Sequence, residues 1–95
     1  MSILKNYSLH KTPKNVLEEI ALKIKTLRKQ QGITQSDLAK KSGVSFGSIK
    51  RFETTGQISL ESLLKIAHVL GRLEDFDLVL NKRDDDSHES LFTIK

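Results

Sequence analysis

The side chains best suited to chemistry lie between residues 45 and 55, where hydroxyl groups and two cations recur at helical spacing. At about 100° per residue, a helix over this stretch has two distinct sides. Ile49, Phe52 and Glu53 share one side, and Gly47, Lys50, Arg51 and Thr54 share the other. The first side would pack on a core, and the second is offered to a partner.

Catalytic and metal-binding patterns are not apparent elsewhere. His68 falls beside the core positions of a predicted helix and is interpreted as a half-buried packing residue. Asp84–Asp86 and His88 are residue types that bind metal ions. Consecutive carboxylates in an extended segment point in alternating directions, however, so we interpret this run as a solvated linker. No nucleophile and base pair or glycine-rich phosphate loop is visible. We therefore expect no enzyme, no catalytic residue, no cofactor and no metal.

Composition limits the chain to a single domain. A chain of 95 residues buries roughly 60 to 65 per cent of the surface that its unfolded form exposes. The absence of cysteine excludes disulfides and thiolate-bound zinc and is compatible with a reducing cytosol. No signal peptide and no run of about 18 apolar residues is present, so we expect a cytoplasmic protein without a membrane partner.

The net charge of +4 is unevenly distributed along the chain. Residues 1–58 hold eleven basic and four acidic side chains, whereas residues 59–95 hold five basic and eight acidic ones. A basic half of this kind is what a polyanion partner requires. Composition alone favours the alternative of a solvated lysine-rich surface, because so small a surplus is common in soluble domains.

Residues 34–56 predict two short helices joined by a tight turn. Thr34 is suited to cap the first helix, and Asp37 follows three residues later. Gly43 can take the left-handed conformation that ends a helix, and Ser45 can then cap the next one. This arrangement is typical of a helix-turn-helix.

Helices are also predicted on both sides of this unit, which gives an all-α, five-helix domain over residues 12–81. Thr12 and Pro13 open a first helix whose apolar residues recur every three or four positions as far as Gln31. A fourth helix is predicted at Leu60–Leu70, with a core face of Leu60, Leu63, Leu64, Ala67 and Leu70. A fifth, at about Glu74–Asn81, adds Phe76, Val79 and Leu80.

The two ends of the chain lack helical periodicity. Residues 1–11 are interpreted as an N-terminal extension, and residues 82–95 begin as a charged linker. The linker is followed by the β-prone string Leu91, Phe92, Thr93 and Ile94. A lone strand is unstable, so its obvious partner is the same string in a second copy of the chain. A disordered C-terminus explains this segment equally well.

The stretch from Ile24 to Phe76 resembles the DNA-binding domains of the XRE family, which are the five-helix domains like those of lambda repressor and Cro. It contains LRKQQGITQSDLAKKSGVSFGSIKRFETTG followed by ISLESLLKIAHVLG. The resemblance implies a DNA-binding transcriptional regulator and a structural ion pair between Arg28 and Glu53, joining the first and third helices. The predicted inward facing of Glu53 agrees, because a carboxylate there would otherwise be buried without a partner.

The resemblance also assigns contacts to double-stranded DNA. Gln35 and Ser45 correspond to residues that bind phosphates near helix N-termini, and Lys50 is better placed for a phosphate than for a base. Arg51 is the strongest candidate for specificity, because a guanidinium can bridge the O6 and N7 atoms of guanine. The positions that meet base edges in the major groove are Phe46, Gly47, Ser48 and Arg51.

One feature departs from the common pattern of this family, and another indicates a subgroup of it. The link Glu53–Gly56 is one residue longer than the Glu-x-Gly link common in this family, which puts the usual phosphate contacts of the loop in question. The sequence IKRFETTGQISLESLLKIAHVLGRLEDFD is similar to antitoxins encoded beside HipA-type kinase toxins. In those antitoxins a C-terminal strand completes a dimer sheet, a role that would suit Leu91–Ile94.

Two functional hypotheses follow. The first is a repressor that binds a palindromic operator as a homodimer and that, on the narrower resemblance, is the autoregulating antitoxin of a HipA-type kinase. The alternative is an interaction module that mainly neutralises a toxin kinase, with DNA binding secondary. In a third hypothesis the helix-turn-helix binds only proteins and no DNA. The basic N-terminal half of the chain argues against it.

Overall fold

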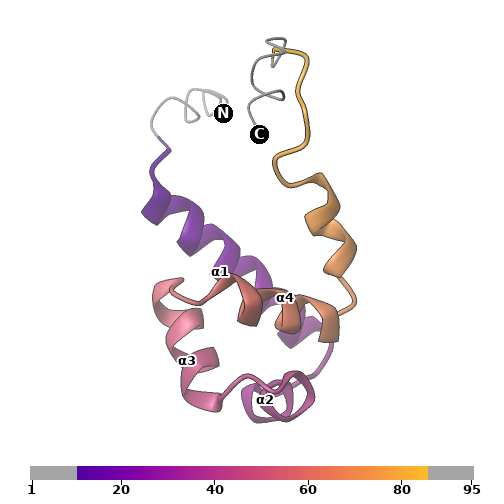
Figure 1. Cartoon of the computed structure of the whole chain (residues 1–95). Helices are drawn as coiled ribbons and strands as arrows, with labels where there is room; N and C mark the ends of the chain where they lie inside the picture. The colour runs from indigo at the N-terminus through magenta and orange to yellow at the C-terminus, as the bar shows by residue number, and fades with distance from the viewer. Residues whose placement is uncertain (1–10, 86–95) are drawn as a thin grey trace.

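The computed structural model describes residues 11–85, which form four α-helices and one 3₁₀ helix and contain no strand. The elements are α1 (Pro13–Gln30), α2 (Gln35–Ser42), α3 (Phe46–Thr55), α4 (Leu60–Val69) and η2 (Leu73–Leu78). In Figure 1, α2 and α3 lie together at one end of the molecule, and η2 leaves α4 toward the other end. The predicted all-α class is confirmed. The predicted dimerising string Leu91–Ile94 and most of the N-terminal extension lie outside the described residues.

Each of the four α-helices begins at a capping side chain. In every case the hydroxyl oxygen accepts a hydrogen bond from the backbone N–H three residues later, which satisfies one of the donors that a helix start leaves free. The donor–acceptor distances are 3.0 to 3.1 Å. The capping residues are Thr12, Thr34, Ser45 and Ser59, and the first three were predicted from the sequence to stand at helix starts.

The core lies where α1, α2, α3 and α4 meet. Its largest fully buried side chains are Leu38, Ile49, Phe52 and Ile66, one from α2, two from α3 and one from α4. Apolar side chains of α1, including Ala21 and Ile24, complete the cluster. Because two of the four come from α3, that helix is fixed on the core along its inner side.

The longer link after α3 is anchored against α1. Gly56 ends α3 in the left-handed conformation, with φ +83°, and its N–H donates to the carbonyl of Phe52 at 2.7 Å. A β-carbon built on Gly56 would lie 2.8 Å from three atoms of Leu17 in α1. The backbone of the link therefore passes so close to α1 that any side chain at this position would force the link or the helix to move.

The predicted fifth helix is present, but its type and its bounds differ from those expected for an α-helix at Glu74–Asn81. The structure has instead the short 3₁₀ helix η2, which begins after Arg72 without a side-chain cap. Phe76 packs against the core as predicted, but Val79 and Leu80 are exposed, and Leu80 has a positive φ of 60°. Only one of the three apolar residues thus gains burial, which is too little to hold a longer helix in place.

Three details of α4 also differ from the prediction. Leu60 is 66% exposed, because it occupies the first position of the helix, where no neighbouring element covers it. Ile66, which was absent from the predicted core face, is fully buried. His68 is exposed rather than half-buried.

Within residues 11–85, none of the helices combines the length and the hydropathy that a membrane-spanning segment requires.

Candidate nucleic-acid interface

The outer side of α3 presents the predicted contact residues to solvent. Phe46, which is 47% exposed, stands at its first turn, and the other side chains follow at helical spacing. Lys50 lies over the Phe46 ring, with its Nζ atom 5.7 Å from the ring centre, so that the ring and the ammonium form one surface. The exposed residues of this face are Ser45, Phe46, Gly47, Ser48, Lys50 and Arg51.

The inner side of α3 carries the ion pair that the resemblance implied. Arg28 Nε donates to Glu53 Oε2 at 2.7 Å, and Arg28 Nη2 donates to Glu53 Oε1 at 3.0 Å. The two side chains are only 8% and 3% exposed. A third hydrogen bond, from Arg28 Nη1 to the carbonyl of Ile33 at 2.8 Å, joins the same guanidinium to the loop before α2. Arg28 therefore fixes the positions of α2 and α3 relative to α1.

Glu53 remains ionised in this setting. Burial alone would raise the pKa of its carboxyl, but hydrogen bonds from Arg28 and Gln35 and the positive charges of Arg28 and Lys25 outweigh that effect. The net result is a pKa below the ordinary value of 4.5.

Gln35 takes part in this cluster as well as standing at the start of α2. Its Nε2 donates to Glu53 Oε1 at 2.9 Å, so the side-chain amide links the first residue of α2 to α3. One role is thus structural. The backbone N–H groups of the first turn of α2 and the second N–H of the Gln35 amide are the donors available to the predicted phosphate contact.

Ser45 and Ser48 form a pair at the start of α3. The Ser45 hydroxyl accepts from the Ser48 backbone N–H at 3.1 Å and donates to the Ser48 hydroxyl at 2.8 Å. Ser48 Oγ is therefore held in a defined place on the exposed face, where it has a proton of its own to donate.

Sequence reasoning missed one residue beside this face. The Arg51 guanidinium donates from Nη2 to Gln57 Oε1, a side chain of the loop after α3. The two residues line a surface hollow together with Ser48 and the start of α4. The signal in the sequence was the longer link, but its length alone does not say which loop side chain turns toward α3.

Gly47 gives a direct test of how closely this face approaches a partner. A β-carbon built on Gly47 meets nothing within 4 Å, so Gly47→Ala leaves the fold intact and adds up to about 1 kcal/mol to the free energy of unfolding. We expect it to weaken DNA binding about fivefold or more if the backbone of α3 touches the groove, because an added methyl in a close contact costs about 1 to 3 kcal/mol. Fluorescence anisotropy with the duplex that the native protein selects measures the affinity. Unchanged affinity would place Gly47 outside the contact.

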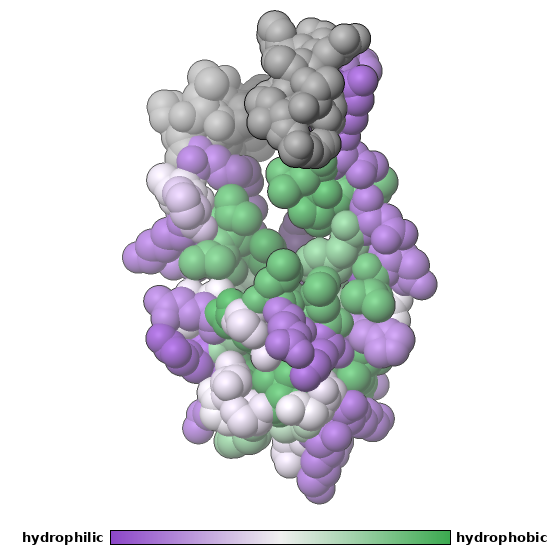
Figure 2. All heavy atoms as spheres, viewed as in Figure 1, coloured by the Kyte–Doolittle hydropathy of each residue, from purple (hydrophilic) through white to green (hydrophobic). Residues whose placement is uncertain are grey.

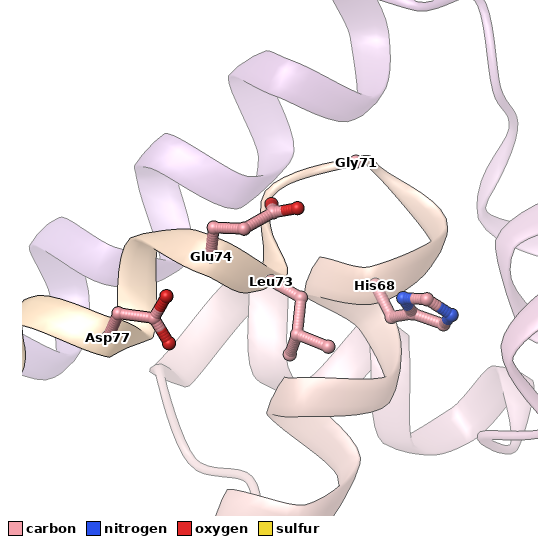
Figure 3. Close-up of a pocket in the computed structure, with 5 residues that line it drawn as sticks. All are labelled: His68, Gly71, Leu73, Glu74 and Asp77. Carbon is pink, nitrogen blue, oxygen red and sulfur yellow. The ribbon is translucent and has the colours of Figure 1, made fainter.

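A second hollow, at the other end of α4, lacks the geometry of a metal site. His68, Glu74 and Asp77 line it together with Leu73 and Gly71. Figure 3 shows that the imidazole of His68 points away from the carboxylates of Glu74 and Asp77. Leu73 lies between His68 and these two residues. Among residues 11–85, no group of three or more such side chains is placed to hold a metal ion.

Comparison with known proteins identifies the fold independently. The sequence model of one protein family, described as helix-turn-helix, matches residues 24–76, a range that runs from α1 to η2 and includes Arg28, Glu53 and the whole of α3. No curated protein and no solved structure matches the chain.

Proposed function

The chain belongs to the XRE-type helix-turn-helix family of DNA-binding transcriptional regulators, and from that premise we propose that it is a sequence-specific repressor. The observation that carries the proposal is the division of α3 into two sides. One side is fixed to the core by Ile49, Phe52 and the Arg28–Glu53 pair, whereas the other presents Ser48 and Arg51 to solvent. A rigid helix with an exposed polar face is what major-groove reading requires.

In this proposal the contacts divide into two kinds. Arg51 and Ser48 donate hydrogen bonds to base edges, and Phe46 supplies an apolar contact for a thymine methyl. Gln35, Ser45 and Lys50 contact phosphates on either side of the groove and fix the register of the helix on the duplex. Few base-reading groups are available on one helix, so each copy of the protein reads a short site.

A short site per copy favours a homodimer on a palindromic operator. Two copies would place two α3 helices in successive major grooves about 34 Å apart. We propose that the string Leu91–Ile94 joins the copies. The duplexes that the protein selects from the DNA upstream of its gene should then carry two inverted half-sites at this spacing. A single unrepeated site would contradict the dimer.

Arg51→Ala tests the base-reading role. We expect the affinity for the selected duplex to fall about tenfold to a hundredfold at fixed salt, because a bidentate contact to guanine contributes about 1 to 3 kcal/mol of discrimination. The affinity for mixed-sequence DNA should change far less. Anisotropy titrations with both duplexes at one salt concentration measure the ratio, and an unaltered ratio would remove Arg51 from the base-reading set.

Lys50→Ala is the matched control on the same face. It should weaken binding to both duplexes by a similar factor and lower the slope of log affinity against log salt by about 1, as the loss of one phosphate contact does. Equal behaviour of the two variants would contradict the assignment of separate roles.

We also propose a narrower role as the antitoxin of a HipA-type kinase, on the sequence similarity from Ile49 to Asp77. Exposed apolar side chains that lie away from the proposed DNA-binding face support this narrower role. Leu78, Val79 and Leu80 are 74%, 55% and 97% exposed, and Figure 2 shows hydrophobic residues on the face between α1 and η2, away from α3. Exposed apolar groups in such number are typical of protein contacts. A kinase encoded by the adjacent gene should co-purify with the protein, and its absence would leave a repressor alone.

A further inference from the structure

The loop after α3 contains a closed ring of three hydrogen bonds. Arg51 Nη2 donates to Gln57 Oε1, the Gln57 backbone N–H donates to Thr55 Oγ1 at 3.1 Å, and Thr55 Oγ1 donates to the Arg51 carbonyl at 2.8 Å. Each of the three residues is therefore both a donor and an acceptor within the ring. All three are exposed, so the core does not dictate these positions.

The ring is tied to the rest of the fold through Gly56, which lies between two of its members. Gly56 packs against the backbone of Leu17 in α1 and donates to the Phe52 carbonyl. The Gln57 side chain thus begins from a backbone that α1 holds in place.

A free arginine side chain on a surface loses much rotamer entropy when it binds, about 2 kcal/mol if it is fully immobilised. The Gln57 amide restricts the Arg51 guanidinium in advance and occupies only one of its five N–H donors. Among residues 11–85, no carboxylate lies within ion-pair distance of Arg51. The partner that orients Arg51 is therefore neutral, and the full positive charge remains available to DNA.

We propose that Gln57, held by Thr55, is the positioning residue that presents Arg51 to the base it reads. This inference rests on the proposed base-reading role of Arg51. It assigns to the loop after α3 a part in specificity. Removal of either Gln57 or the Thr55 hydroxyl should weaken specific binding without touching the DNA contact itself.

The chain offers a matched pair of threonines for the test. Thr54 and Thr55 are both exposed, and each hydroxyl donates to the carbonyl four residues earlier, at 3.0 and 2.8 Å. Only Thr55 also accepts from Gln57. We compare Gln57→Leu, Thr55→Val and, as the control, Thr54→Val. Urea unfolding of each variant verifies that the fold is unchanged.

The first readout needs no DNA. NMR relaxation of the Arg51 Nε–H group in the full chain should show a restricted guanidinium in the native protein and in Thr54→Val, and a mobile one in Gln57→Leu and Thr55→Val. Equal mobility in all four proteins would overturn the positioning role, whatever the variants do to DNA binding.

The second readout is anisotropy with the most enriched duplex from selection and with mixed-sequence DNA. Gln57→Leu and Thr55→Val should lower the affinity for the selected duplex about two- to tenfold, the cost of ordering one long side chain, and leave mixed-sequence binding unchanged. Thr54→Val is the control for the first readout only, because Thr54 shares the side of α3 that is offered to DNA. In an Arg51→Ala background, Gln57→Leu should have no further effect.

The outcomes separate the two proposals. An undiminished effect of Gln57→Leu in the Arg51→Ala background would mean that Gln57 contacts DNA itself, which overturns the positioning role. Loss of Arg51 restriction in Gln57→Leu, combined with full DNA binding by Arg51→Ala, would instead overturn the base-reading role on which the inference rests.

Discussion

Gly56→Ala is expected to destabilise the protein by about 2 to 5 kcal/mol, much more than the same substitution at the other helix-ending glycine of the helix-turn-helix. Gly56 has φ +83°, a conformation that costs an alanine about 1 to 2 kcal/mol. A β-carbon there would also lie 2.8 Å from the carbonyl carbon, the oxygen and the β-carbon of Leu17. Two of these atoms belong to the α1 backbone, so the link or the helix must move, which adds about 1 to 3 kcal/mol.

Gly43→Ala is the control, because it changes the same conformation without the contact. Gly43 ends α2 with φ +78° and donates its N–H to a carbonyl four residues earlier, as Gly56 does, but a β-carbon there meets nothing within 4 Å. Its expected cost is therefore only about 1 to 2 kcal/mol. Urea unfolding of both variants measures the difference. Equal costs would show that the approach of the link to α1 contributes no strain.

The helix-turn-helix was predictable because its signals are local. A capping hydroxyl and a glycine after the last turn specify where a helix begins and ends within a few residues of sequence. Thr34, Gly43 and Ser45 show this in the structure, where each takes the predicted capping position.

The region after α4 was not predictable in the same way. Val79 and Leu80 have the spacing of a helical face, but periodicity does not report whether another element is present to cover that face. The structure leaves both exposed beyond a short 3₁₀ helix. The same reason explains Leu60, which has the correct spacing at a position that nothing covers.

The candidate site was predictable in its residue types and not in its side-chain contacts. Helical spacing alone predicted Arg51 and Glu53 on different sides of the helix. The structure places them on opposite sides of α3. The contact between Arg51 and Gln57 depends on the path of the link after α3. The hydrogen bond from Gln35 to Glu53 depends on where α2 meets α3. The first contact joins residues six apart and the second joins residues eighteen apart, and helical spacing predicts neither of them.

Arg28→Met is expected to reduce the free energy of unfolding by about 3 to 5 kcal/mol at neutral pH, because removal of one member of a buried pair leaves an unpaired charge. The Glu53 side chain is 3% exposed and would retain only the Gln35 amide as a donor. The Ile33 carbonyl would also lose the Arg28 donor, which loosens the loop before α2. Chemical unfolding followed by circular dichroism measures the loss.

The double variant Arg28→Met/Glu53→Leu separates the charge from the packing. Replacement of both members by apolar side chains removes the unpaired carboxylate, so we expect it to recover much of the lost stability. Recovery should be incomplete, because the Ile33 carbonyl and the Gln35 amide still lose a partner. A double variant less stable than Arg28→Met would contradict a dominant role for the charge.

The pH dependence gives an independent signature of the same pair. In the native protein the pKa of Glu53 lies below its ordinary value of 4.5, so its contribution is fully present above that value and is lost as the pH falls through the lower folded pKa. In Arg28→Met the main influences that lower this pKa are removed while burial, which raises it, remains. Protonation then relieves the unpaired charge instead of breaking a pair. We therefore expect the stability difference between the native protein and Arg28→Met to be smaller at pH 4 than at pH 7. A difference that does not change with pH would mean that the loss arises from packing around Arg28 and not from the charge on Glu53.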